Sequence, residues 1–76
     1  MNQLDKFIQR MKLIGIDIEV VGNVPRIYLT KINGKPVKEK KDSEYGFVIA
    51  YFPIRYGETI ELVNIKETFN LIKKYR

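Results

Sequence analysis

The sequence contains no cysteine, no histidine and no tryptophan. Without cysteine the chain can form neither a disulfide nor a thiolate metal site, so packing alone must hold the fold together. Without histidine it lacks the commonest general base and another preferred ligand of transition metals. It also lacks a phosphate-binding glycine loop and the residue spacing of a calcium or zinc site. We therefore expect a protein without cofactor or metal, and not an enzyme.

Two weaker chemical alternatives remain. Ser43 is the only serine, and it stands in a charged segment where carboxylates are the only bases nearby. Asp17 and Glu19 are two residues apart and would share one face of a strand, where they could act as an acid and base or bind a cation. A plain loop position for Ser43 and the solvated face of an edge strand for the two carboxylates explain the same residues, and we favour these explanations.

Long hydrophobic runs are also missing. No apolar stretch approaches the ~20 residues of a membrane-spanning helix. Near the N-terminus, Asp5, Lys6 and Arg10 interrupt the place where the apolar part of a signal peptide would lie. We therefore expect a cytoplasmic protein with no membrane partner. The length of 76 residues suits a single domain, residues 1–76, in which folding buries only ~60% of the chain's surface.

The sequence does contain a long apolar segment. Residues 45–56 hold most of the aromatic side chains, and residues 47–52 carry no charge. Such a run has no side that prefers water, so either the protein covers both faces or one face awaits a partner. We predict that this segment is the central strand of a sheet.

Helices are predicted at both ends of the chain. Apolar residues recur at intervals of three and four over residues 2–14 and about 65–75. Gly15 is expected to end the first helix in the left-handed conformation. Asn64 and the glutamate three residues later have the spacing of a capping box at the start of the second helix. The predicted apolar stripe of that helix consists of Ile65, Phe69, Ile72 and Tyr75.

Strands and turns are predicted between the helices. Residues 16–21 are predicted to form a strand because their first four positions alternate apolar and acidic side chains, and residues 26–32 form a second run suited to a strand. The pair Asn33-Gly34 that follows is the strongest hairpin signal, because a type I′ turn needs a positive φ at both positions. The returning arm carries Pro36, which confines it to a sheet edge. A short last strand is expected at residues 59–62.

This order of elements predicts an α+β domain with an antiparallel sheet of three to four strands plus a short hairpin arm. Both helices should pack on one sheet face. If side chains alternate strictly along the strands, the helix-facing core consists of Leu4, Ile8, Ile18, Val20, Ile27, Leu29, Phe47, Ile49, Tyr51, Phe69 and Ile72.

The opposite sheet face is the first candidate binding site, because its predicted side chains are too apolar for a purely solvated surface. It would bind another protein or a second copy of the chain in a homodimer. The predicted members of this site are Tyr28, Thr30, Ile32, Val48, Ala50 and Phe52.

The charge of the chain suggests a second candidate site. The net charge is +5, and residues 35–41 and 64–76 each carry four basic side chains against one glutamate. If both segments lie on one side of the fold, they would attract nucleic-acid phosphates, with Tyr28, Tyr45 or Tyr56 available to stack on bases. Otherwise they are ordinary solubilising charges. The nucleic-acid candidates are Lys35, Lys38, Lys40, Lys41, Lys73, Lys74 and Arg76.

The chain as a whole also resembles a known group of small proteins. Between two amphipathic helices it places, in order, Ile27-Tyr28-Leu29, Asn33-Gly34-Lys35, Tyr45-Gly46-Phe47 and Pro53-Ile54-Arg55. This succession is similar to that of small proteins encoded by bacteriophages and prophages of gut bacteria, a group without an established activity, cofactor or site. The resemblance implies a compact accessory protein acting in a host cell. From the residues, we expect it to bind another protein through the apolar sheet face or an edge strand, or alternatively nucleic acid.

Overall fold

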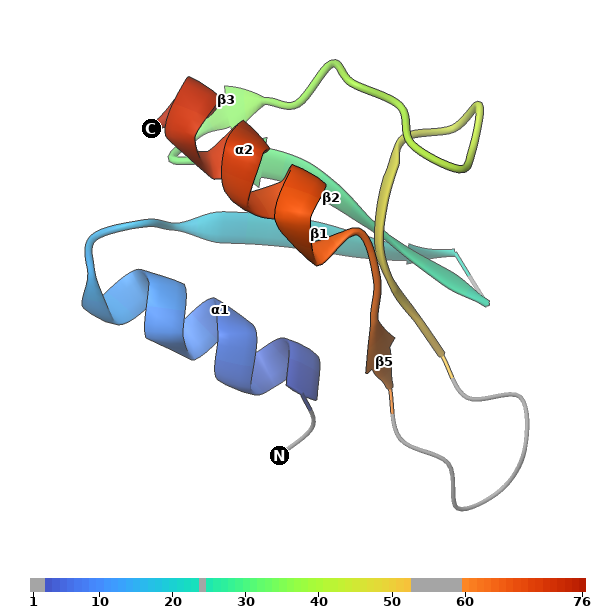
Figure 1. The fold of residues 1–76 in the computed structure, drawn as a ribbon, viewed down its shortest axis with the longest axis horizontal. Helices are drawn as coiled ribbons and strands as arrows, with labels where there is room; N and C mark the ends of the chain where they lie inside the picture. The colour runs from blue at the N-terminus through green and yellow to red at the C-terminus, as the bar shows by residue number, and fades with distance from the viewer. Residues whose placement is uncertain (1–2, 24, 53–59) are drawn as a thin grey trace.

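The computed structural model describes residues 3–23, 25–52 and 60–76 of the chain. Its elements are α1 (Gln3–Leu13), β1 (Ile18–Asn23), β2 (Arg26–Ile32), β3 (Lys35–Pro36), β4 (Phe47–Tyr51), β5 (Glu61–Leu62) and α2 (Ile65–Tyr75). The strands form one antiparallel sheet in the order β1-β2-β4-β5, and β3 pairs with the far end of β2. Both helices lie on the same face of this sheet (Figure 1), so the predicted α+β fold is confirmed.

Helix α1 ends as the sequence predicts. Gly15 has a φ of 83°, a left-handed conformation that glycine adopts without steric cost. The backbone N–H of Ile16 donates to the Met11 carbonyl at 2.9 Å, and that of Gly15 donates to the Lys12 carbonyl at 3.1 Å. These two bonds form a Schellman ending, which satisfies the last carbonyls of the helix and turns the chain toward β1.

The turn between β2 and β3 is also determined locally. Asn33 and Gly34 have φ values of 52° and 78°, both positive as a type I′ turn requires. Asn33 fastens this turn to the start of β1, because its backbone N–H donates to the Asp17 carbonyl and its Oδ1 accepts the Asp17 N–H, both at 2.7 Å. Strand β3 ends at Pro36, as expected for proline at a sheet edge.

Two irregularities in the sheet change which side chains face the helices. Thr30 of β2 is an extra residue in the register with β1, and Ile49 of β4 is an extra residue in the register with β2. An extra residue reverses the alternation of the side chains that follow it. As a result Ile32 and Ala50 lie in the core instead of on the opposite face. Tyr51, predicted to face the helices, is not a member of the core.

The core lies between the sheet and the two helices. Phe47 and Ile49 are buried in it as predicted, and Ile8 and Val20 pack against it while partly buried. The fully enclosed layer therefore draws on both helices and on β1, β2 and β4. Its members are Leu4, Ile16, Ile18, Ile27, Leu29, Ile32, Phe47, Ile49, Ala50, Leu71 and Ile72.

Helix α2 has the predicted bounds, and Ile72 lies in the core as predicted with Tyr75 packed against it, but the buried stripe is shifted from the predicted one. Phe69, predicted in the core, is 42% exposed, whereas its neighbour Thr68 is 1% exposed. The Thr68 hydroxyl donates to the Asn64 carbonyl at 2.7 Å, so its burial leaves no unsatisfied hydroxyl. Asn64 makes no side-chain cap, which corrects the predicted capping box. Its φ is 54°, and its Nδ2 donates to the Val48 carbonyl at 2.8 Å. This bond anchors the helix start to β4, with Thr68 toward the sheet.

The last predicted strand is present as β5, whose residues Glu61 and Leu62 pair with the end of β4. Its predicted start at residue 59 lies outside the described part of the chain, and so does the candidate stacking residue Tyr56. Neither α1 nor α2, the helices of the described part, has the length and apolar character needed to cross a membrane.

Candidate functional site

The sheet face opposite the helices is closed at Tyr28 by residues 41–46. The Tyr45 ring lies on the Tyr28 ring, with centroids 4.7 Å apart and planes tilted by 54°. The Ser43 hydroxyl donates to the Tyr28 hydroxyl at 3.3 Å. Tyr28 is therefore only 4% exposed, and its cross-strand neighbour Val48 is fully buried. This face does not present its central aromatic side chain to a partner.

The predicted open apolar face is absent from the described part of the chain. Thr30 is half-buried, and its hydroxyl donates to the Glu19 carbonyl at 3.0 Å. Phe52 is half-buried against the core. The prediction is wrong because it assumes unbroken alternation along β2 and β4 and does not place residues 41–46 over Tyr28. The other four predicted members of the face are all buried, namely Tyr28, Ile32, Val48 and Ala50.

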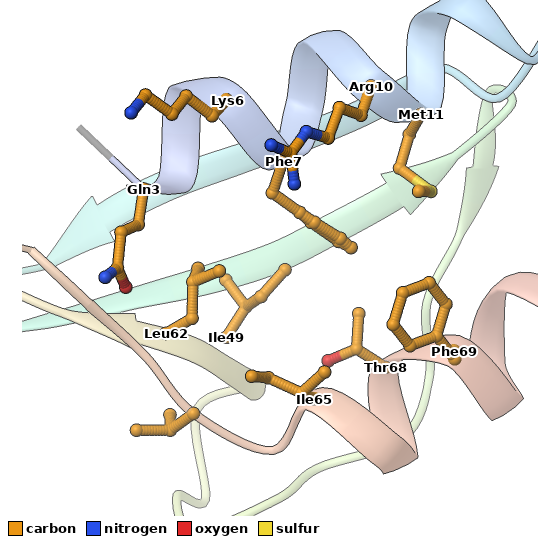
Figure 2. Close-up of a pocket in the computed structure, with 11 residues that line it drawn as sticks. Gln3, Lys6, Phe7, Arg10, Met11, Ile49, Leu62, Ile65, Thr68 and Phe69 are labelled. Carbon is orange, nitrogen blue, oxygen red and sulfur yellow. The ribbon is translucent and has the colours of Figure 1, made fainter. Parts of the chain in front are cut away.

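An apolar groove runs instead between α1 and α2, above the sheet (Figure 2). We call it the inter-helix groove, and its volume is about 370 Å³. Across it the rings of Phe7 and Phe69 meet edge to face, with centroids 5.7 Å apart and planes at 79°. Its apolar lining includes Phe7 and Met11 from α1, Ile49 from β4, Leu62 from β5, and Ile65 and Phe69 from α2.

The groove leaves large apolar side chains in contact with water. Ile65 is 51% exposed and Phe69 is 42% exposed, and both line the same groove. Sequence reasoning missed this site because it assigned Phe69 to the core. A signal was present, since Leu71 adds to the predicted stripe and makes the apolar surface of α2 wider than the strip that the helix buries on the sheet.

The rim of the inter-helix groove is basic. Lys6 and Arg10 are four residues apart on α1, and both extend along the groove's α1 side (Figure 2). Of the described residues that line the groove, none is acidic. Asp5, the single carboxylate of α1, is not among them. An apolar floor beside a positive rim is complementary to a partner that carries apolar side chains next to carboxylates.

A second surface forms where the loop after β3 meets the end of α2. The Tyr75 hydroxyl donates to Glu39 Oε2 at 2.6 Å and accepts the backbone N–H of Lys38 at 3.3 Å. Lys74 Nζ forms an ion pair with Glu39 Oε1. The Lys74 ammonium, and after it the Tyr75 hydroxyl, lower the pKa of Glu39 from 4.5 to about 2, and Glu39 raises the pKa of Lys74. Strand β3 and the C-terminal end of α2 lie side by side in Figure 1.

These contacts bring the two basic segments of the sequence together into one surface, which we call the lysine surface. Glu39 lies between the segments and is paired with Lys74. Of the proposed stacking residues, Tyr28 is buried and Tyr45 is 66% exposed with its ring resting on Tyr28. Lys41 is half-buried, and the exposed candidates are Lys35, Lys38, Lys40, Lys73, Lys74 and Arg76.

The structure also places the three residues considered for catalysis or cation binding, namely Ser43, Asp17 and Glu19. The Ser43 hydroxyl donates to Tyr28 and its oxygen accepts the backbone N–H of Tyr45 at 3.0 Å, so it holds the loop closed. Asp17 and Glu19 are exposed at the start of the β1 edge of the sheet. Across residues 3–23, 25–52 and 60–76, no group of three or more acidic side chains is placed to hold a metal ion.

Comparisons of this chain with protein-family models, with curated proteins and with solved structures find no match. The inter-helix groove and the lysine surface are therefore the two candidate sites of this chain.

Proposed function

We propose that this is a non-enzymatic protein that binds another protein in its inter-helix groove. The observation that supports this most directly is the exposure of Ile65 and Phe69 beside an apolar floor. Full burial of a side chain of this size contributes about 1.5–3 kcal/mol. In a domain of 76 residues, with a total stability of only a few kcal/mol, two such residues left half in water favour a surface that a partner covers.

The proposed setting is the cytoplasm of a bacterial host cell. The resemblance to proteins encoded by phages and prophages supports an accessory role there. The homodimer expected from the sequence used the sheet face around Tyr28 and Val48, and that face is buried under residues 41–46. The proposed binding site therefore lies on the helical side of the molecule and not on the opposite sheet face.

A second candidate function is nucleic-acid binding through the lysine surface. The contact of Glu39 with Lys74 and Tyr75 favours it, because this contact brings two basic segments side by side. Several exposed ammonium groups on one surface attract phosphates independently of base sequence. Two observations rank it second. Lys74 is already paired with a carboxylate, and the aromatic ring of Tyr28 is buried and cannot stack on a base.

Affinity capture from a bacterial lysate, with and without nuclease, tests the two candidates together. The groove variant is Ile65→Gln. Its matched control is Leu13→Gln, because Leu13 is 85% exposed on α1 and does not line the groove. The lysine-surface variant combines Lys40→Glu with Lys41→Glu. We expect captured proteins that survive nuclease treatment, are lost with Ile65→Gln and are retained with the other variants.

The opposite pattern would favour the second candidate. Capture that disappears with nuclease and with the double lysine variant, but persists with Ile65→Gln, would place binding on the lysine surface. A melting curve for each variant shows whether it is folded. Ile65 is already half exposed, and glutamine is a good helix former, so Ile65→Gln should remain folded.

A further inference from the structure

We infer that the occupant of the inter-helix groove is an acidic amphipathic helix of the partner. The inference rests on the proposed function, since it names the partner chemistry of the same groove. Hydrogen-bonding capacity, dimensions and charge of the groove each support it.

Hydrogen-bonding capacity favours a helix over an extended segment. The groove floor consists of side chains such as Ile49 and Leu62, and the hydroxyl of Thr68 already donates to the Asn64 carbonyl. A partner backbone lying there finds few groups to pair with, and unpaired backbone groups are unfavourable in an apolar site. A helix satisfies these groups internally and offers the groove only its side chains.

Dimensions favour a short helix over a small molecule. The α1 side of the groove extends from Gln3 to Met11, which is about 12 Å of helix, or roughly two turns. A partner helix of that length presents apolar side chains at positions i, i+3 or i+4, and i+7. Sites for small molecules enclose most of the ligand surface, whereas here Ile65 and Phe69 remain half exposed along the wall.

Charge favours an acidic partner over a second copy of this chain. Lys6 and Arg10 are spaced i, i+4, so they face two carboxylates with the same spacing along the flank of a partner helix. A second copy of this chain would instead add a second basic rim, and another net charge of +5, to the same interface. Like charges opposed across an interface disfavour the complex.

The test uses a pair of fluorescein-labelled 18-residue helical peptides. Both carry leucine at i, i+3 and i+7, and they differ only in the flanking i, i+4 pair, which is glutamate in one and lysine in the other. Fluorescence anisotropy at 50 mM salt gives their affinities. We expect the glutamate peptide to bind about tenfold more tightly, because two exposed attractions are replaced by two repulsions. The preference should shrink at 500 mM salt.

Variants of the protein assign the effect to the rim. Lys6→Glu with Arg10→Glu should abolish or reverse the preference. Lys73→Glu with Arg76→Glu changes the net charge equally but lies outside the groove, so it should preserve the preference. Ile65→Gln should weaken both peptides, whereas Leu13→Gln should weaken neither.

Each other outcome would overturn the inference. Equal affinities for the two peptides, both weakened by Ile65→Gln, would leave the proposed function standing and refute the acidic partner. If neither peptide binds while Ile65→Gln still abolishes lysate capture, the helical partner is refuted and the proposed function stands. A dimer in sedimentation that Ile65→Gln dissociates would show that the occupant is a second copy. If Ile65→Gln changes neither peptide binding nor lysate capture, the inference and the proposed function are both refuted.

Discussion

Tyr75, the last residue of α2, donates its hydroxyl to Glu39 across 36 positions of sequence, at 2.6 Å. Glu39 also pairs with Lys74. Through these contacts one carboxylate joins the loop after β3 to the C-terminal end of the chain.

The Glu39 carboxylate should make stability depend on pH in the acid range. Its pKa is about 2 in the fold against an ordinary value of 4.5, because Lys74 and Tyr75 favour the charged form. Its contribution is therefore complete above pH 4.5 and is lost as the pH falls through 2. Both partners of the ion pair are accessible to solvent, which screens the charges, so this contribution is small.

Melting temperatures between pH 6 and pH 2 check this expectation. The difference between wild type and Glu39→Gln should be largest near pH 6 and should be small at pH 2. A difference that stays constant with pH would show that the glutamine affects stability through packing and not through charge.

Phe47 and Phe69 should differ sharply in their contributions to stability. Phe47 is buried in the core, so Phe47→Ala should cost ~3–5 kcal/mol, most of the stability of such a domain. Phe69 is half exposed and has its edge-to-face contact with Phe7, so Phe69→Ala should cost about 1–1.5 kcal/mol. Urea unfolding measures both. Equal losses would place Phe69 in the core, as the sequence alone predicts.

Substitutions at Ala50 and Tyr51 test the register irregularity at Ile49 in the pairing of β4 with β2. Ala50 is fully buried, so Ala50→Gln adds volume and an unpaired amide to the core and should cost more than ~3 kcal/mol. Tyr51 is half-buried and outside the core, so Tyr51→Gln should cost about 1 kcal/mol. Thermal melting of the two variants, followed by circular dichroism, measures both losses of stability. A larger loss for Tyr51→Gln than for Ala50→Gln would show that side chains alternate strictly along β4.

Binding of short DNA should show a purely electrostatic signature if the lysine surface is used. For about four neutralised phosphates, log K falls against log salt with a slope near −3 to −4, or roughly two decades between 50 and 200 mM salt. Lys40→Glu with Lys41→Glu should weaken all DNA sequences about equally, while Lys6→Glu with Arg10→Glu should have little effect.

We expect this DNA binding to be weak at 200 mM salt. Tight binding that persists there and is lost with the Lys40 and Lys41 reversals would reverse the ranking of the two functions.

Local features of the fold were predictable from short stretches of sequence. The end of α1 at Gly15 and the turn at Asn33-Gly34 each need a positive φ, which glycine and asparagine supply wherever the chain places them. Strand β2 was predicted with its observed bounds, Arg26–Ile32, because a short apolar-rich run between two turns indicates a strand. These features depend on backbone sterics within a few residues, and such information is present in the sequence itself.

The binding surfaces were decided by contacts between distant residues. Extra residues at Thr30 and Ile49 depend on how neighbouring strands align, and they moved Ile32 and Ala50 into the core. The exposure of Phe69 follows from the anchoring of α2 to β4, which neither segment encodes alone. Hydrophobic burial has no direction of its own, so sequence reveals which residues are apolar, and only the packed arrangement selects which of them remain open to a partner.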